Sequence, residues 1–377
     1  MSNVTKSYNT IVIGGGQAGL ATGYYLQRQG LDFVILDAGK RIGDTWRTRW
    51  DSLRLFTPAR YSSLPGMPFP ASRLYIPSKD EMADYLVAYA ERFDLPVELG
   101  VQIERLERKG ERFVLAAGDT RFESDNVVIA TGAYHSPRIP AFAADLSADI
   151  LQLHSSEYRR PSQLRKGDVL VVGAANSGAE IALELSRTHH VCLSGRYPGS
   201  EPTRPGSAIN NLVVPLMWFV FSHVLNVKTP IGRKVRPKLL SMGLPLGRVR
   251  PNDLLEAGVE RVHERTVGVQ DGLPVLADGR VVDVANVIWC TGFRPDYHWI
   301  DLPIFADDGY PLHERGVVTS APGLYFVGLF FQTAATSALI GGVGRDASYI
   351  VKKIATRPVE AAAADRAWSS SRQTVGT

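Results

Sequence analysis

Two glycine-rich turns in this sequence have the residue types and spacing that bind the phosphates of a nucleotide. The first turn follows a short apolar run at residues 10–13 and precedes a segment rich in Ala and Leu. In a strand, turn and helix of this kind, backbone N–H groups and the helix N-terminus face a bound pyrophosphate. The sequence therefore predicts a dinucleotide site made by Gly14, Gly16, Gln17, Ala18 and Gly19, whose glycines have the G-x-G-x-x-G spacing.

A carboxylate completes this first site. A second apolar run, residues 33–36, ends at Asp37, which lies 18 residues after Gly19. An acidic residue at about that distance hydrogen-bonds the ribose hydroxyls of an adenosine dinucleotide. The acid and the glycines together favour a dinucleotide site over a tight turn alone.

The second turn, at residues 173–178, departs from the first in two ways. Ala175 replaces the middle glycine, and its methyl group narrows the approach to the phosphates. The next apolar run, residues 191–195, is followed by Arg196 instead of an acid. Because an arginine pairs with a 2′-phosphate that an acid would repel, the second site is expected to take NADPH rather than NADH. Its predicted contacts are Gly173, Ala175, Asn176, Ser177, Gly178, Ser194 and Arg196, and the alternative for Arg196 is a solvated surface residue.

The two turns belong to an internal repeat. Residues 9–21 resemble residues 168–180, with Gly14 and Gly173 separated by 159 positions. Residues 126–132 recur as residues 286–292 at an offset of 160. Two matches at nearly one spacing predict two copies of a βαβ unit, each closed by a strand that ends in Thr-Gly. The predicted fold class is α/β with two Rossmann-like dinucleotide-binding domains, and the closing turns add Ala130, Thr131 and Gly132 and then Cys290, Thr291 and Gly292 as cofactor contacts.

Composition limits the remaining classes of protein. With 377 residues, of which 45% are hydrophobic, the chain is long enough for two domains with cores. Its two cysteines, Cys192 and Cys290, form no disulfide framework, zinc spacing or redox pair, so no metal site is predicted. A net charge of +4 is too small to indicate nucleic acid. Without a basic leader or an apolar cleavable segment, the expected location is the cytoplasm.

The sequence resembles the class B flavin monooxygenases, which include flavin-containing, yucca-type and Baeyer–Villiger enzymes. The resemblance covers residues 8 to 351 and depends on the two glycine turns, residues 42–46, both Thr-Gly turns, residues 290–296 and residues 341–346. It implies that FAD binds the first copy, with Gly43, Thr45 and Trp46 among its contacts, and that NADPH binds the second. The NADPH domain (166–280) is then inserted in an FAD domain formed by residues 1–165 and 281–356, and residues 357–377 form a flexible tail.

The family signature F-x-G-x-x-x-H is kept only at its last position, His154, since Ala148 and Ile150 stand where the family has Phe and Gly. In the family this histidine lies in the hinge between domains, whereas on its own His154 suits a linker residue bonded to backbone. Pro58 follows Thr57 where animal-type members have an Asn beside the flavin, and yucca-type members also lack that Asn. Thr57 and His154 are candidate catalytic residues.

The implied reaction moves a hydride from NADPH to FAD and then adds O₂ to the reduced flavin. The resulting flavin hydroperoxide inserts one oxygen atom into a small organic substrate, at sulfur, nitrogen or beside a carbonyl. Arg294 and Asp296 are candidates near the flavin, with a structural ion pair as the alternative. A C-terminal helix containing residues 344–350 is expected to point its N-terminus at the flavin pyrimidine edge, where Gln332, Thr333 and Ser337 are candidate contacts or core residues.

Two other functions remain open. One is an NADPH oxidase or reductase without oxygen insertion, and the other is a membrane-docked or partner-binding flavoprotein. A disulfide reductase would need a cysteine pair beside the flavin, which this sequence lacks.

An insert at residues 202–252 interrupts the second copy. It contains no acid and eight Lys or Arg. Its apolar run, residues 212–225, is shorter than the roughly 20 residues of a membrane-spanning helix. Five Lys or Arg follow between residues 228 and 238, which permits peripheral membrane contact through residues 212–238. The alternatives are a lid over the substrate entrance, a dimer contact, or a buried helix pair on the NADPH domain.

Overall fold

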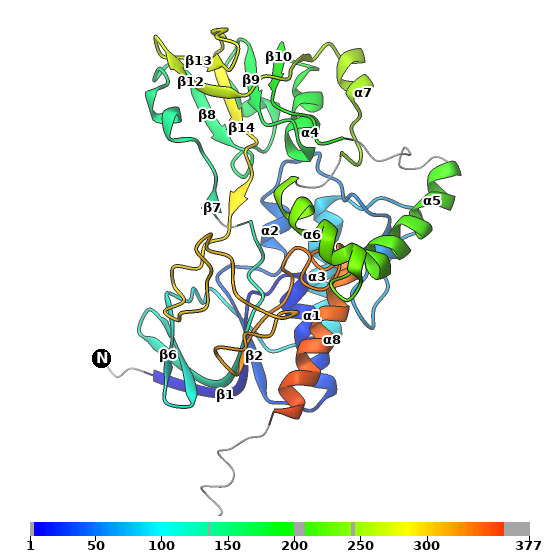
Figure 1. Ribbon diagram of the computed structural model, residues 1–377, viewed down its shortest axis with the longest axis vertical. Helices are drawn as coiled ribbons and strands as arrows, with labels where there is room; N and C mark the ends of the chain where they lie inside the picture. The colour runs from blue at the N-terminus through cyan, green and yellow to red at the C-terminus, as the bar shows by residue number, and fades with distance from the viewer. Residues whose placement is uncertain (1–3, 135, 200–207, 243–245, 358–377) are drawn as a thin grey trace, which may run out of the picture.

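The computed structural model describes residues 4–134, 136–199, 208–242 and 246–357, in two α/β units stacked along the long axis of the molecule (Figure 1). Parts of the predicted insert (202–207 and 243–245) and of the predicted tail (358–377) lie outside the described residues.

The first unit is built on a sheet with the strand order β3-β2-β1-β6-β5-β4, to which β16 adds by pairing with β6. The pairs among β3, β2, β1, β6 and β16 are parallel, whereas β4, β5 and β6 form an antiparallel meander. These strands are β1 (Val4–Ile13), β2 (Phe33–Asp37), β3 (Val97–Leu99), β4 (Arg105–Lys109), β5 (Arg112–Ala117), β6 (Thr120–Ile129) and β16 (Leu324–Phe326).

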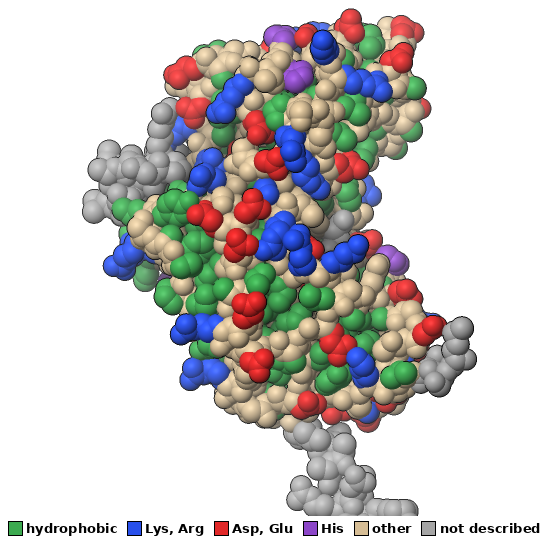
Figure 2. Space-filling view, turned by 180° about the vertical axis from the view of Figure 1, so that it is seen from behind, with side chains coloured by type: hydrophobic (Ala, Val, Ile, Leu, Met, Phe, Trp, Pro, Cys, Tyr) green, Lys and Arg blue, Asp and Glu red, His purple; other side chains and the backbone are tan. Residues whose placement is uncertain are grey.

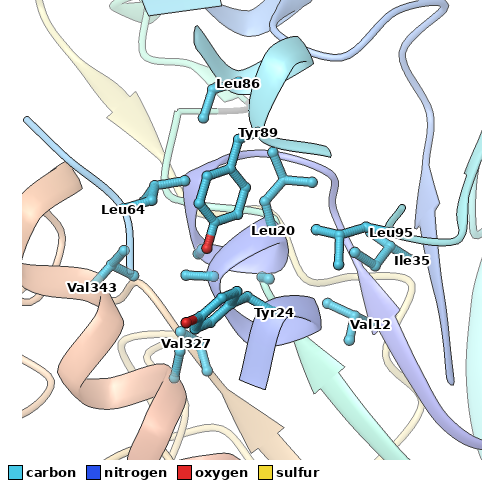
Figure 3. Packing of buried hydrophobic residues seen from close by; sticks show 14 of the residues in the cluster. Val12, Leu20, Tyr24, Ile35, Leu64, Leu86, Tyr89, Leu95, Val327 and Val343 are labelled. Atoms are coloured by element: carbon cyan, nitrogen blue, oxygen red, sulfur yellow. The ribbon is translucent and has the colours of Figure 1, made fainter. Parts of the chain in front are cut away.

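Helices α1 (Gln17–Arg28), α3 (Lys79–Arg92) and α8 (Ile340–Thr356) cover one face of this sheet. Their shared core contains Tyr24 of α1, Tyr89 of α3 and Val343 of α8, which Figure 3 shows around the strand residues Val12 and Ile35. The Tyr24 and Tyr89 ring centroids lie 6.2 Å apart. This packing fixes the first turns of α1 and α8 relative to the sheet.

The second unit is a parallel sheet with the order β11-β10-β9-β14-β8. Its strands are β8 (Leu151–His154), β9 (Val169–Val172), β10 (Val191–Ser194), β11 (Glu260–Val262) and β14 (Asn286–Trp289). Helices α4 (Asn176–Leu185) and α7 (Pro251–Glu256) and the hairpin of β12 (Thr266–Gln270) and β13 (Leu273–Leu276) complete it. The two sheets confirm the predicted α/β fold class.

The two connections between the units pair with each other as β7 (Ser136–Pro137) and β15 (Phe293–Arg294). The predicted domain limits, 165 and 280, are therefore wrong at both ends, because β8 and β14 belong to the second sheet. β14 pairs with β9 as β6 pairs with β1, so each copy keeps its own closing strand. The remaining short helices are α2 (Asp44–Arg47) and the single turns Ala59–Tyr61, Ala141–Asp145 and Pro161–Gln163.

The described part of the insert forms α5 (Ala208–Phe219), a π-helical turn (Val220–Val224) and α6 (Pro230–Met242). Although its sequence lies within the second copy, it packs on the first unit. Val227 N–H donates to the carbonyl of Thr333 at 2.8 Å, and Ala335 N–H donates to that of Leu225 at 3.0 Å. Trp218 stacks on Tyr61 with ring centroids 4.6 Å apart. The prediction that the insert forms a helix pair buried on the NADPH domain is therefore wrong, because the insert bonds to residues 333 and 335 of the first unit.

Within the described residues, no helix combines the length and apolar character required to cross a membrane.

Candidate active site

Both glycine turns have the same backbone geometry. Gly14 and Gly173 have φ values of +107° and +108°, which favour glycine. A Cβ on Gly14 would lie 2.7 Å from the Ala130 carbonyl oxygen, and one on Gly173 would lie 2.4 Å from that of Cys290. A Cβ on Gly19 would lie 1.8 Å from the Gly14 carbonyl oxygen, and one on Gly178 would lie 1.8 Å from that of Gly173. These glycines bring each closing strand and helix tightly against the turn.

The middle position of the turn serves a different purpose. At Gly16, which is the N-cap of α1, no atom lies within 4 Å of the place that a Cβ would take, so the fold itself does not require glycine there. The space in front of Gly16 is part of a cavity, and a side chain would fill it. Ala175 occupies the equivalent N-cap position of α4.

This cavity has a volume of ≈ 500 Å³ and runs along the carboxyl ends of β1, β2 and β6. It brings together most of the predicted FAD contacts and one predicted catalytic residue. The predicted residues that line it are Gly14, Gly16, Gln17, Ala18, Asp37, Gly43, Thr45, Trp46, Ala130, Thr131, Gly132 and Asp296. Gly19 lies behind this wall, where it packs on Gly14.

Two side chains in the cavity have polar atoms suited to a dinucleotide. Asp37 accepts hydrogen bonds from Gly15 N–H at 2.5 Å and from Gly39 N–H at 2.7 Å, which fixes its carboxylate at the cavity wall. The buried Thr131 hydroxyl has no hydrogen-bond partner among the described residues. A fixed carboxylate, an orphaned hydroxyl and the open space at Gly16 fit the ribose and pyrophosphate of FAD.

The second turn does not line this cavity. Arg196 follows Gly195 at the end of β10 and is exposed, so its guanidinium is accessible to a nucleotide phosphate. Ser194 is buried, and its hydroxyl donates to the Glu264 carbonyl at 2.9 Å, so this side chain stabilises the protein instead of facing the turn. Asn176 accepts a hydrogen bond from Gly247 N–H at 3.0 Å, and Ser177 lies beside it in the first turn of α4.

His154 lies in the hinge between the domains. Its Nε2 donates to the Gly292 carbonyl at 3.0 Å, because a carbonyl can only accept. Its Nδ1 therefore carries no proton and accepts from Ser156 N–H at 3.1 Å. The ring is buried, and this burial lowers the pKa of His154. A neutral imidazole fixed on both nitrogens positions the hinge, and it does not line the cavity.

Asp296 is the predicted catalytic residue that reaches the cavity, where it bonds the ring of His298. Arg294 is exposed in β15 and is not among the lining residues. The Thr57 hydroxyl bonds Ser62 Oγ at 2.9 Å and lies outside the cavity wall. The Thr291 hydroxyl likewise donates to the Arg138 carbonyl at the hinge.

Gln332 and Ser337 are directed into the protein. Gln332 Nε2 donates to the Phe326 carbonyl at 2.8 Å, and Ser337 Oγ accepts from Thr333 and Ala334 N–H at 3.0 Å each. Both side chains are buried and do not line the cavity, so they shape the loop before α8. Instead, Ala338 and Val343 from this region reach the cavity.

Sequence patterns missed several lining residues, which loops and the helices α3 and α8 supply from other parts of the chain. Gly328 could have been found from its place two residues after the end of β16. Val343 lies in the segment 341–346 that carries the resemblance. The sequence analysis did not single out the following lining residues: Ala38, Gly39, Arg41, Leu86, Val101, Gln102, Ile103, Tyr134, His298, Trp299 and Ala338.

The two cysteines do not form a reactive pair. Both are buried free thiols, and neither lines the cavity. Burial raises the pKa of Cys192 to about 11 and also raises the pKa of Cys290. Among the described residues, no group of three or more His, Cys, Asp or Glu side chains is placed to hold a metal ion.

Comparison with known proteins identifies the family. Residues 11–229 match the family described as pyridine nucleotide-disulphide oxidoreductase. An oxidoreductase from Geobacillus kaustophilus named CzcO-like is 42% identical over 92% of this chain and 98% of its own length. The indole-3-pyruvate monooxygenase YUCCA1 of Oryza sativa is 33% identical, with 91% of this chain and 90% of that protein covered. The chain belongs to the class B flavin monooxygenases.

The solved structure of a flavin-containing monooxygenase from Stenotrophomonas maltophilia agrees with this family. It is 30% identical, covers 93% of this chain and 98% of its own, and superimposes with a TM-score of 0.74. This class B flavin monooxygenase is thus an enzyme, a flavin-dependent oxidoreductase, and its family implies FAD and NADPH as cofactors. The predicted family, fold class and cofactors are confirmed.

Proposed function

We propose that this flavin monooxygenase uses NADPH to reduce FAD and inserts one oxygen atom from O₂ into a small organic substrate, by S- or N-oxygenation or by a Baeyer–Villiger reaction. The observation that carries the proposal is the pair of matching glycine turns, one opening on the cavity with Asp37 and the other close to an exposed Arg196. The two turns provide separate places for two dinucleotides, as a reductive and an oxidative half-reaction in one chain require.

FAD in the first site supplies hydride acceptance and the activation of O₂. The protein binds and orients: Gly14, Gly16 and the first turn of α1 hold the pyrophosphate, while Asp37 holds the ribose. In the second site, Gly173 and the first turn of α4 hold NADPH, and Arg196 pairs with its 2′-phosphate.

The hinge determines how the two nucleotides meet. Trp46 packs against the cores of both units, and His154 ties β8 to the Gly292 turn through its Nε2. Thr57 and Pro58 offer no free hydroxyl or amide to the reacting ring, since the Thr57 hydroxyl bonds Ser62. Orientation of the bound groups and exclusion of water are therefore the contributions that we assign to the protein in the oxidative step.

Stopped-flow absorbance separates oxygenation from the oxidase alternative. The purified enzyme is reduced with NADPH and then mixed with oxygenated buffer in the absence of substrate. A long-lived absorbing species distinct from oxidised and reduced flavin supports the proposal and leads to a screen of sulfides, amines and ketones. An immediate return of the oxidised spectrum supports an NADPH oxidase or reductase, and a protein that binds no FAD contradicts the whole assignment.

A specific observation also favours peripheral membrane contact through the insert. Leu216, Phe219 and Ile231 have 63%, 55% and 56% of their surface exposed. Exposed Lys228, Arg233, Lys234 and Lys238 accompany them, and Figure 2 shows apolar and basic side chains together at the edge where α5 lies. Exposed apolar and basic groups in a segment without acids suit an anionic lipid surface. We propose that the insert docks the enzyme on such a surface.

A further inference from the structure

Arg49 lies where the two units of the protein meet. It stands between Trp46, which packs on both cores, and Trp50, which is buried in the core of the second unit. Its guanidinium carbon lies 5.3 Å from the ring centroid of Phe293 and 5.7 Å from that of Tyr134. Phe293 belongs to β15 and Tyr134 precedes β7, so Arg49 contacts both chain connections between the units.

One of the two rings beside Arg49 also lines the cavity. Tyr134 lines the flavin cavity and has 66% of its surface exposed. Its ring meets Phe293 edge to face, with centroids 5.4 Å apart. The Arg49 guanidinium therefore lies next to a residue of the cavity wall, at the junction of the two units.

The charge of Arg49 is not balanced by an acid. Within the described residues, no hydrogen bond or ion pair joins its guanidinium to a carboxylate. Burial lowers the pKa of Arg49, Tyr134 opposes this shift, and the neighbouring cation Arg159 adds to it. Two aromatic faces attract a guanidinium but accept none of its five N–H groups in a normal hydrogen bond.

Neighbouring arginines show how this chain normally satisfies such a group. Arg47 donates to Asp84 at 2.6 Å and to the Ile42 carbonyl at 2.7 Å. Arg54 donates to the Ile76 carbonyl at 2.9 Å, and Arg159 donates to the Ser156 carbonyl at 2.6 Å. Arg49 differs from all three because no such hydrogen bond joins its guanidinium to another described residue.

We infer that Arg49 is an anion-binding residue at the domain junction, whose guanidinium, held against the rings of Tyr134 and Phe293, takes a carboxylate or phosphate oxygen of a ligand. Planar guanidinium groups bind both kinds of oxygen in a bidentate manner. The junction offers two sources of such an oxygen, the pyrophosphate of NADPH and a carboxylate of the organic substrate. The inference rests on the proposed function only in assuming that the nicotinamide end of NADPH or the substrate crosses this junction.

The test measures binding to the FAD-loaded enzyme without turnover. Arg49→Gln removes the charge, and Arg49→Lys keeps the charge but loses the planar guanidinium. Arg92→Gln is the control, because Arg92 also lies over an aromatic ring, Phe93, but at the exposed end of α3. The probes are NADP⁺, phenylacetate and its uncharged methyl ester, each titrated against the flavin absorbance spectrum. FAD content and melting temperature verify that each variant folds.

We expect Arg49→Gln to weaken binding of NADP⁺ or of phenylacetate by about tenfold or more, while methyl phenylacetate and Arg92→Gln are unaffected. Weaker NADP⁺ binding identifies the phosphate as the source, and weaker phenylacetate binding identifies a carboxylate. Arg49→Lys should lie between wild type and Arg49→Gln, and it provides the comparison if the uncharged variant fails to fold. Unchanged binding of both anions in a folded, FAD-loaded variant would overturn the inference. Because no oxygenation is measured, failure of the monooxygenase proposal would leave this result intact.

Discussion

At the scale of single residues, polar groups in this enzyme divide into those that face a nucleotide and those that hold the backbone. Asp37 does both, since its two oxygens accept from Gly15 and Gly39 while it lines the cavity. Ser194, Gln332 and Ser337 serve only the fold. A residue of the right type at the right place in a pattern is therefore a site residue only when its side chain also lines the cavity, as that of Asp37 does.

Asp37→Asn should weaken FAD binding. The variant loses the negative charge and one of two acceptors, and a hydrogen bond to a charged group is worth about 1.5–3 kcal/mol, or roughly 10- to 150-fold in affinity. Reconstitution of the apoprotein with FAD, followed by flavin fluorescence, measures the dissociation constant. Asp84→Asn, at an exposed carboxylate that pairs with Arg47 and does not line the cavity, is the control and should change affinity little. Equal effects of the two variants would remove Asp37 from the ribose site.

Arg196→Gln should raise the KM for NADPH far more than the KM for NADH. The lost interaction is a charge-assisted pair with the 2′-phosphate, again about 1.5–3 kcal/mol. Steady-state oxidation of each nucleotide gives the two KM values. Arg187→Gln, an exposed arginine after α4, is the control. If both nucleotides respond equally to the Arg196 change, this residue does not recognise the phosphate.

At the scale of elements, different glycines of the first strand, turn and helix unit serve folding and cofactor binding. Gly14 is fixed by a positive φ and by the Ala130 carbonyl, whereas the space at Gly16 is open to the cavity.

Gly14→Ala and Gly16→Ala should therefore fail in different ways. Gly14→Ala should destabilise the folded protein by roughly 1–3 kcal/mol of backbone strain, or more where the carbonyl cannot move. Gly16→Ala should unfold at the wild-type urea concentration as apoprotein but bind FAD about tenfold more weakly or worse, because its methyl group approaches the phosphates. Urea unfolding of the apoproteins and FAD titration distinguish the two. A destabilised Gly16→Ala apoprotein would contradict this division.

The hinge element should be sensitive to pH through His154. Burial lowers the pKa of His154 below 6.5, so as the pH falls through about 6.5 the unfolded chain takes up a proton that the folded chain does not. The free energy of unfolding should therefore fall as the pH decreases from 7 towards 5, and less steeply in His154→Gln. Urea unfolding at several pH values measures this slope, and His263→Gln, at an exposed histidine, is the control. Burial also lowers the pKa of the partly buried His313, to about 4. His313 is present in both proteins, so its contribution to the pH dependence cancels from the comparison.

At the scale of the whole molecule, the insert joins units that the chain order separates. It leaves the second sheet, bonds to residues 333–335 of the first unit and exposes apolar side chains outward. The insert is therefore a third link between the two domains, in addition to the connections that contain β7 and β15.

Binding to lipid should depend on the outward face of the insert. The wild-type enzyme should co-sediment with vesicles that contain phosphatidylserine and much less with neutral phosphatidylcholine vesicles. Combined Leu216→Ser and Phe219→Ser should abolish this binding, and Lys234→Gln with Lys238→Gln should reduce it and its salt dependence, at about 1 kcal/mol per basic residue. Leu255→Ser, at an exposed leucine of α7 outside the insert, is the control. Vesicle binding that persists in the serine variants would contradict docking through the insert, as would the absence of binding by the wild-type enzyme. In either case a lid over the substrate entrance or a dimer contact would remain as the role of the insert.

The sequence by itself determined the repeat, the two glycine turns and Asp37, because tight turns and strand ends depend on local backbone sterics and on fixed spacing. It also determined the α/β class, since the apolar runs and turns alternate along the chain. Only the tertiary structure decided that β8 and β14 join the second sheet, that the insert packs on the first unit, and that Gln332 and Ser337 face inward. These outcomes depend on which surfaces bury one another across long sequence separations. The inference about Arg49 could not have been made from the sequence either. It depends on two rings contributed by residues 134 and 293, and on the absence of a carboxylate beside the guanidinium within the described residues.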